Sequence, residues 1–299
     1  MAPSTSSQGT PAAPANPLDA LWRRMAAAVF APATDARVSV TGDLDVTEAL
    51  AYLREHRPPG VPMGLLHLVA AAIARTIAED VPAMNTYLRR GRVRPKRSLD
   101  VLLTAKVPGA NALTAIRLAN AHRRAARDLA VASRAGVARL RTPEGQRSLQ
   151  RSYTLARLPW TLRRPLFRAI RRLSHGFGFA LPRLDLAPES FGTVVLSEVG
   201  RYRPGGPAPS VRGVSVNGPL VPAAQGTSVV WLMEPHPKPV VVDGAVTIRT
   251  IAAFSVTLDH RLVDGHHIGQ FITGVARRMQ EPAVLDALPI LASPTSVAS

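Results

Sequence analysis

Apolar and polar residues follow one another along this chain in patterns that predict helices beside many strands. Apolar residues recur at helical spacing in 64–79 and 265–280, a shorter helix is expected to end near Leu53, and a largely polar helix is predicted over 114–136. Alternating segments predict strands at 37–40, 86–94, 99–107, 192–197, 227–233, 238–242 and 245–258, with a tight turn at Asp243-Gly244. The pattern therefore predicts an α+β two-layer sandwich, with helices packed on a mixed sheet.

One short segment concentrates residues suited to chemistry. Asp259 to Gly265 reads Asp-His-Arg-Leu-Val-Asp-Gly and stands between the last predicted strand and the last predicted helix. This junction places the imidazole of His260 where it can reach a cleft, and histidine suits general-base work near neutral pH. Asp264 can fix a local turn or a salt bridge that aims the ring, and Gly265 permits a tight backbone.

The segment from Asp259 to Gly265 resembles, without a gap, the D-H-R-x-x-D-G signature of the catalytic domain of 2-oxo acid dehydrogenase acyltransferases. That family shares its fold with chloramphenicol acetyltransferase. A second similar segment, Gly192 to Gly200, keeps the glycines, the threonine and the serine of the family and has Glu198 where the family has asparagine. Weaker similarities are Pro82-Ala83-Met84-Asn85, after an apolar helix, and the basic segment Leu21 to Met25.

The resemblance predicts the domain organisation. Residues 18–288 are expected to form the catalytic domain, between an Ala/Pro/Ser-rich disordered segment at 1–17 and a flexible tail at 289–299. Residues 141–190 read as an insertion. The substrate-channel segment G-L-x-x-P-V-I of the family has no clear copy, although Lys106-Val107-Pro108-Gly109-Ala110-Asn111 stands near its place. No room is seen for a lipoyl module, so a stand-alone form is expected.

The resemblance also implies an activity and a role for each residue. His260 would remove the proton from the thiol of coenzyme A (CoA) or dihydrolipoamide, and Ser197 would stabilise the oxyanion of the tetrahedral intermediate. Asp264 would hold the local geometry, paired with an arginine that the sequence does not identify. In this family the site lies between subunits of a trimer, so His260 of one chain would meet Ser197 of its neighbour. CoA is then a substrate, a lipoyl acceptor would come in trans, and no metal is needed.

Other interpretations remain open. His260 could be a structural histidine in an inactive relative, and Ser197 could cap a loop. The fold would then serve as an oligomeric scaffold. His266 and His267 could form a metal cluster with His260, but their spacing matches no established zinc pattern.

Composition narrows the possible classes of function. The chain of 299 residues has no cysteine, which excludes disulfides and thiolate catalysis. No secretion signal is visible, and the longest apolar run, 63–74, is too short to span a bilayer. A cytoplasmic protein is therefore expected. The formal net charge of +17 favours attraction of anions, although the preference for arginine over lysine also fits a GC-rich genome.

The segment 147–179 alternates arginines with large apolar residues, and prolines break it into short helices. It could lie as an amphipathic basic hairpin on an anionic membrane, or it could be a subunit-packing arm with solvent-exposed arginines. Nucleic-acid binding would rest on charge alone, because aromatic residues are few and no known nucleic-acid motif is present.

Overall fold

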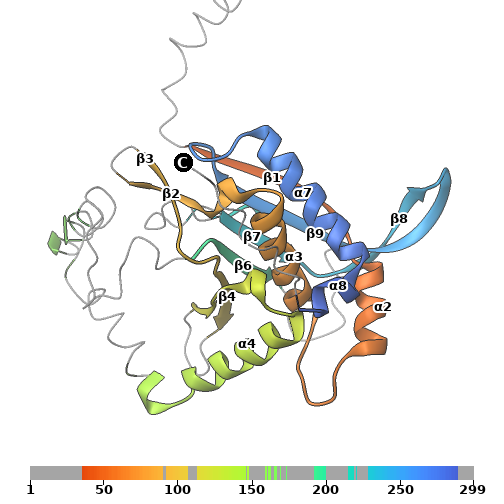
Figure 1. Ribbon diagram of the computed structural model, residues 1–299, viewed down its shortest axis with the longest axis horizontal. Coiled ribbons are helices and arrows are strands. Elements are labelled where there is room, and N and C mark those ends of the chain that lie inside the picture. The colour runs from red at the N-terminus through yellow and green to blue at the C-terminus, as the bar shows by residue number, and fades with distance from the viewer. Residues whose placement is uncertain are drawn as a thin grey trace, which may run out of the picture. The chain divides into compact units, whose positions relative to one another are not determined.

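A mixed β-sheet with helices on one face forms the frame of the protein in the computed structural model (Figure 1). The structure describes residues 36–89, 92–106, 113–145, 192–199, 215–218 and 228–288, together with isolated positions between them. Within these ranges the main sheet has the strand order β1-β9-β7-β6-β4-β5, and β8 pairs with the first half of β9. Its strands are β1 (Arg37–Asp45), β4 (Val101–Lys106), β5 (Leu113–Leu118), β6 (Val194–Val199), β7 (Ser228–Met233), β8 (His236–Val242) and β9 (Ala245–Asp259).

The helices cover one face of this sheet and bury its apolar side chains. Alternate residues of β6, β7 and β9, such as Leu196, Leu232 and Phe254, join a single core with Leu68 of α3 and Phe271 of α7. The expected α+β two-layer architecture is confirmed. Its helices are α2 (Thr47–His56), α3 (Leu65–Glu79), α4 (Ala126–Leu140), α7 (Gly265–Gln280) and α8 (Pro282–Asp286), with 3₁₀ turns η1 (Pro82–Asn85) and η2 (Ala121–Arg123).

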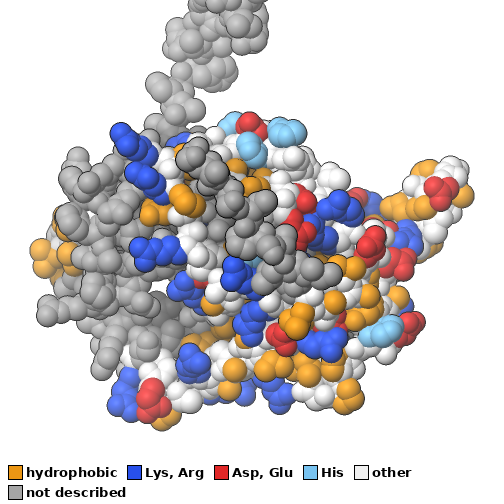
Figure 2. All heavy atoms as spheres, in the orientation of Figure 1, with side chains coloured by type: hydrophobic (Ala, Val, Ile, Leu, Met, Phe, Trp, Pro, Cys, Tyr) orange, Lys and Arg blue, Asp and Glu red, His pale blue; other side chains and the backbone are white. Residues whose placement is uncertain are grey.

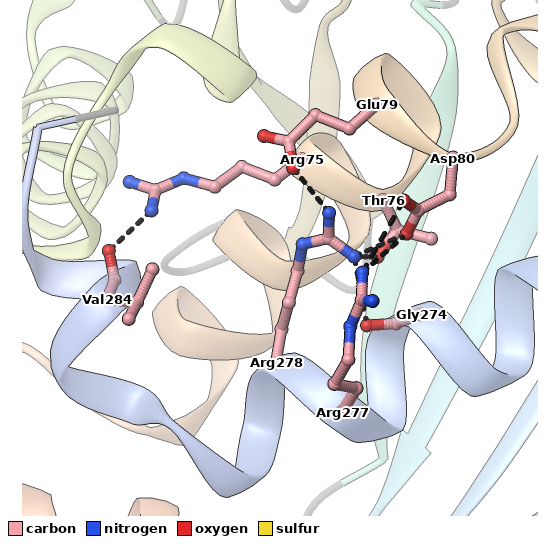
Figure 3. Close-up of polar contacts among 8 residues, drawn as sticks. All are labelled: Arg75, Thr76, Glu79, Asp80, Gly274, Arg277, Arg278 and Val284. Carbon is pink, nitrogen blue, oxygen red and sulfur yellow. Dashed lines mark hydrogen bonds and ion pairs between the residues drawn. The ribbon is translucent and has the colours of Figure 1, made fainter. Parts of the chain in front are cut away.

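Helix α7 is fixed to α3 by a polar cluster within the helical layer (Figure 3). The guanidinium of Arg278 donates to Asp80 Oδ2 and to Glu79 Oε2, each at 2.5 Å, and to Thr76 Oγ1 at 3.2 Å. A Cβ at Gly274 would stand only 2.5 Å from Asp80 Oδ2, so the close approach of the two helices requires glycine there. This cluster sets the position of α7 and, with it, of the segment that precedes the helix.

Two predicted elements differ from the structure. The helix predicted over 114–136 is wrong in its first part, because β5 occupies Leu113–Leu118 and α4 begins only at Ala126. Ile116 and Leu118 of β5 are buried while the strand pairs with β4, which satisfies the backbone groups without a helix. The single strand predicted at 86–94 is a hairpin of β2 (Thr86–Arg89) and β3 (Arg92–Pro95).

Several predicted segments lie outside the described residues. They are 1–17, Leu21 to Met25, nearly all of the insertion at 141–190, the channel-like residues 107–111 and the tail at 289–299. The described strands and helices all belong to one unit that begins at Arg37. No helix among the described residues is both long and apolar enough to cross a lipid bilayer.

Candidate functional site

The loop between β9 and α7 is shaped by a pair of side chains on either side of His260. The buried carboxylate of Asp259 accepts from the Arg261 backbone N–H at 3.1 Å and from Arg261 Nε at 2.8 Å. The hydrogen bond from the Arg261 side chain raises the pKa of its guanidinium. The Asp259 carbonyl also accepts from Leu262 N at 3.0 Å, which closes the turn. His260 is held between the two anchors with its own side chain exposed to solvent.

Asp264 caps the N-terminus of α7. Its Oδ1 accepts from the backbone N–H groups of His266 at 3.0 Å and His267 at 3.2 Å, and it lies 2.7 Å from His267 Nδ1. The bond from the His267 backbone is the largest of several contacts that lower the pKa of the Asp264 carboxyl. Among the described residues, its side-chain contacts are with these two histidines and not with an arginine. Asp264 therefore fixes the start of α7, which begins five residues after His260.

Ser197 lies near the end of β6, on the face of the sheet opposite the helices, and only 8% of it is exposed. The hydroxyl of Thr104 on β4 donates to Ser197 Oγ at 2.9 Å. Because Ser197 Oγ is the acceptor in this bond, its own hydrogen remains available to donate to another oxygen. Thr104 was not among the residues expected from the sequence. Thr104 is identified by the parallel pairing of β4 with β6, which brings it beside Ser197 on one face of the sheet.

Within one chain the structure does not bring His260 and Ser197 together. Ser197 pairs with Trp231 of β7, and Trp231 pairs with Ser255 of β9. His260 lies five residues beyond Ser255 along the chain and two strands away from Ser197 in the sheet. At the usual strand rise and spacing, the two residues are therefore about 19 Å apart.

The remaining matched segments do meet. Thr193 Oγ1, at the start of β6, donates to Asn85 Oδ1 at 2.6 Å, which joins the Gly-Thr segment to the Pro-x-x-Asn segment. Gly192 has φ +62°, and a Cβ there would collide with the Leu102 side chain and stand 2.9 Å from the Asp100 carbonyl. Glycine is therefore required where the chain enters β6. The contacts of Gly192 and Thr193 fix the start of β6. The C-terminal end of β9 lies at the same end of the sheet.

The three histidines near the start of α7 are not gathered into one cluster. The rings of His266 and His267 lie edge to face with centroids 6.0 Å apart. In the part of the chain that the structure describes, no group of three or more His, Asp or Glu side chains is placed to hold a metal ion. His267 is instead engaged with Asp264.

Residues 211–286 match the family model of the 2-oxoacid dehydrogenases acyltransferase catalytic domain, and this range includes His260 and Asp264. The match confirms the resemblance over this range and indicates an acyltransferase-type catalytic domain. No curated protein sequence matches the chain.

Three solved structures show the same fold. A probable dihydrolipoamide acetyltransferase from Listeria monocytogenes 4b F2365 is 13% identical, with a TM-score of 0.58, and the alignment covers 82% of this chain and 85% of that one. The dihydrolipoamide acetyltransferase of Azotobacter vinelandii is 15% identical, with a TM-score of 0.57 and 84% of each chain covered. A truncated catalytic core of the 2-oxoacid dehydrogenase multienzyme complex from Thermoplasma acidophilum is 15% identical, with a TM-score of 0.54, covering 88% of this chain and 95% of that one.

The Azotobacter enzyme was investigated for the role in catalysis of a serine, a histidine and an asparagine four residues after that histidine. This chain has Asp264 four residues after His260. At identities of 13–15%, these structures show that the chain shares their fold.

Proposed function

Because the chain carries a catalytic domain of the 2-oxoacid dehydrogenase acyltransferase type, we propose that it transfers an acyl group between CoA and a thiol acceptor of the dihydrolipoamide kind. The observation that carries this proposal is the placement of His260. Its imidazole is exposed between the buried Asp259 and the helix cap Asp264, both of which fix the backbone on either side of it. An exposed ring on a rigid loop is suited to proton transfer with a substrate.

In the proposed reaction, His260 accepts the proton of the attacking thiol. The thiolate sulfur bonds to the thioester carbonyl carbon, and the carbonyl oxygen becomes an oxyanion that receives a hydrogen bond from the Ser197 hydroxyl. The intermediate then collapses, the bond to the first sulfur breaks, and that thiolate takes the proton back from the imidazolium. One oxyanion donor contributes about 2.7–4 kcal/mol where such donors have been removed. Thr104 supports this role because its bond to Ser197 leaves the serine hydrogen free.

The separation of about 19 Å between His260 and Ser197 means that they cannot act on one carbonyl within a single chain. We propose a cyclic trimer in which His260 of one subunit faces Ser197 of the next. The β8–β9 hairpin supports self-association, because it projects from the body of the protein (Figure 1). One face of it presents Val241, Val246 and Ile248, which are 72%, 75% and 66% exposed. Such an apolar stripe favours contact with another protein surface.

Acyl exchange between short acyl-CoAs and dihydrolipoamide tests the proposed function. We expect His260→Ala to lower the exchange rate by about 10²–10⁴-fold, the usual contribution of general-base catalysis. Ser197→Ala should lower kcat with less effect on KM, because the hydroxyl acts on the developing oxyanion. His266→Ala is the matched control, since it removes an exposed imidazole from the same helix terminus. If His260→Ala keeps full activity, the mechanism is wrong, and if the unmodified protein neither reacts nor binds CoA, a scaffold role replaces it.

A further inference from the structure

The β2–β3 hairpin carries a dense run of positive charge. Residues 86–98 contain Arg89, Arg90, Arg92, Arg94, Lys96 and Arg97 and no acidic residue. Arg92 and Arg94 are exposed on β3. Neither of them forms an ion pair with a carboxylate within the described ranges, whereas Arg117, Arg127 and Arg278 all do. Arg92 and Arg94 therefore present positive charge that the described part of the chain does not neutralise.

The register of the hairpin places like charges together. Arg89 stands directly opposite Arg92 in the antiparallel pairing, and Tyr87 stands opposite Arg94. Because residues of a strand alternate between its two faces, Arg92 and Arg94 point to the same side, about 6.6 Å apart. One face of β3 therefore carries two neighbouring positive charges that would attract a partner with negative charge.

The hairpin is anchored beside the end of the sheet that carries His260. At its base, Lys96 N donates to Asn85 O at 2.9 Å, the Lys96 ammonium donates to the Gly192 carbonyl, and Asn85 accepts from Thr193. Val194, the first residue of β6, pairs with Ser228 of β7. Extending the antiparallel register of β7 and β9 by one residue places Ser228 opposite Leu258, near the end of β9. The start of β6, to which the base of the hairpin is bonded, is therefore two strands, about 10 Å, from the end of β9. In Figure 2, the blue side chains over β2–β3 and the pale blue histidines at the start of α7 both lie in the upper part of the view.

We propose that the β2–β3 hairpin is a docking surface for an acidic face of the protein domain that brings the acyl-carrying thiol to His260. This inference rests on the proposed function and names its macromolecular partner. A row of basic side chains beside an active site attracts a partner of opposite charge and orients it on arrival. The partner is a folded protein surface with a short row of carboxylates that matches Arg92 and Arg94.

The surroundings of the two arginines favour a protein over other anionic partners. Val93 is 54% exposed, but the described part of the hairpin has no further exposed large apolar side chain that could enter a bilayer. Tyr87 is buried, so no described aromatic ring of the hairpin is available to stack on nucleic-acid bases. Val93 points to the opposite face of β3 from Arg92 and Arg94, so the side that carries the two arginines is a compact basic surface, as is typical of the polar rim of a protein–protein contact.

The test compares two thiol acceptors with the full chain, namely free dihydrolipoamide and an isolated acidic domain that carries the same dihydrolipoyl group. The variant is Arg92→Glu/Arg94→Glu. The matched control is Arg139→Glu/Arg141→Glu, which makes the same charge change at the exposed end of α4. We expect the first variant to lower kcat/KM for the domain about tenfold relative to kcat/KM for free dihydrolipoamide, and the control to leave this ratio within about twofold. The tenfold effect should shrink at about 0.5 M salt, because exposed charges are then screened.

Binding of the same acidic domain, followed by fluorescence anisotropy, separates this proposal from the proposed function. If the unmodified protein shows no exchange with either acceptor, the proposed function fails. The docking proposal is then still decided by the binding assay, which shows whether Arg92→Glu/Arg94→Glu weakens binding of the domain. Equal binding by this variant and the α4 control overturns the docking surface. The docking surface is also overturned if the variant loses only flotation with anionic phosphatidylserine vesicles, which would assign the hairpin to a membrane.

Discussion

The Thr104 hydroxyl donates a hydrogen bond of 2.9 Å to Ser197 Oγ, across the parallel pair formed by β4 and β6. Ser197 is almost fully buried, so the bond fixes the rotamer of its hydroxyl and directs its hydrogen away from Thr104. Thr104 does not need to touch the substrate for this effect. It is a positioning residue for the proposed oxyanion donor.

We therefore predict that Thr104→Val, which keeps the shape of the side chain, lowers kcat about fivefold, as expected for loss of one neutral hydrogen bond. KM should change little, because the bond matters most when the oxyanion forms. The effect should disappear in the Ser197→Ala background, so the two substitutions are non-additive. Thr247→Val, at an exposed position of β9, is the control. An equal loss of kcat in the presence and absence of Ser197 would show that Thr104 acts in some other way.

The strongest sequence signals predicted the correct elements. The apolar periodicity of α3 and α7 and the alternation of β9 predict their positions closely, because these elements are packed against the core along most of their length. The helix predicted across β5 was wrong because Ile116 and Leu118 fit a strand as well as a helix, and only pairing with β4 decides between them.

The candidate site could be predicted only in part. His260 and Asp264 are four residues apart, so one short segment was enough to predict both as site residues, and their catalytic roles stay predictions. The partner of Asp264 was expected to be an arginine, whereas the structure shows His267 from the same helix turn. Thr104 and Ser197 are 93 residues apart, and their contact exists only through sheet pairing. A single sequence contains no signal for such a pair.

His67 links α3 to α4 and should make stability depend on pH. Gly64 N–H donates to His67 Nδ1 at 3.1 Å, so the other ring nitrogen, Nε2, carries the hydrogen and donates to Ser133 Oγ at 2.9 Å. Burial lowers the pKa of His67 below its ordinary value. The unfolded chain therefore takes up this proton first as the pH falls, and the free energy of unfolding decreases from about pH 6.5 down to the folded pKa.

We predict that His67→Asn, which cannot be protonated, flattens the pH dependence of the urea midpoint between about pH 7 and pH 5. His122 contributes in the same direction, because burial and Arg123 lower its pKa as well, so the slope should be reduced and not abolished. His56→Gln, at an exposed position of α2, is the control and should keep the slope of the unmodified protein. An unchanged slope in His67→Asn would assign the pH dependence to other groups.

Asp264 should contribute to stability in a pH window of its own. The hydrogen bonds that it accepts from the start of α7 lower its pKa, so this stabilisation is present above the unfolded value near 3.8 and is lost as the pH falls through the folded value. We predict that Asp264→Ala lowers Tm at about pH 7 and has a smaller effect at about pH 3. Asp264→Asn should keep most of the Tm, because asparagine also caps helices. The two variants are compared by thermal unfolding, and equal losses at both pH values would contradict the capping role.

The apolar face of the β8–β9 hairpin should be needed for self-association. The base of the hairpin is tied to β1 and α2 by the ion pairs Lys238–Asp43, Arg249–Asp45 and Arg249–Glu48. Val246 and Ile248 lie farther out on one face, with Thr247 on the other. We predict that Val246→Asp/Ile248→Asp converts the oligomer to monomers in sedimentation velocity and abolishes exchange activity. Thr247→Asp should leave both unchanged. Retention of the full oligomer by the double variant would place the subunit contact elsewhere.

Subunit mixing gives the sharpest test of a site shared between chains. His260→Ala and Ser197→Ala chains are each expected to be nearly inactive alone. When they are unfolded together and refolded as mixed cyclic trimers, a site is complete only where a chain with intact His260 is followed by a chain with intact Ser197. Random assortment at equal amounts makes about one quarter of the sites complete, so about one quarter of the unmodified activity should return.

The same result cannot arise if each site lies within one chain, because every chain in the mixture then lacks one of the two groups. The separation of about 19 Å between these residues in one chain leads us to expect recovery. The control is a mixture of His260→Ala chains with chains that carry both substitutions, which contains no intact His260 and should stay inactive. If the first mixture also stays inactive while mixed trimers are seen by native mass spectrometry, Ser197 and His260 of different chains do not form one site.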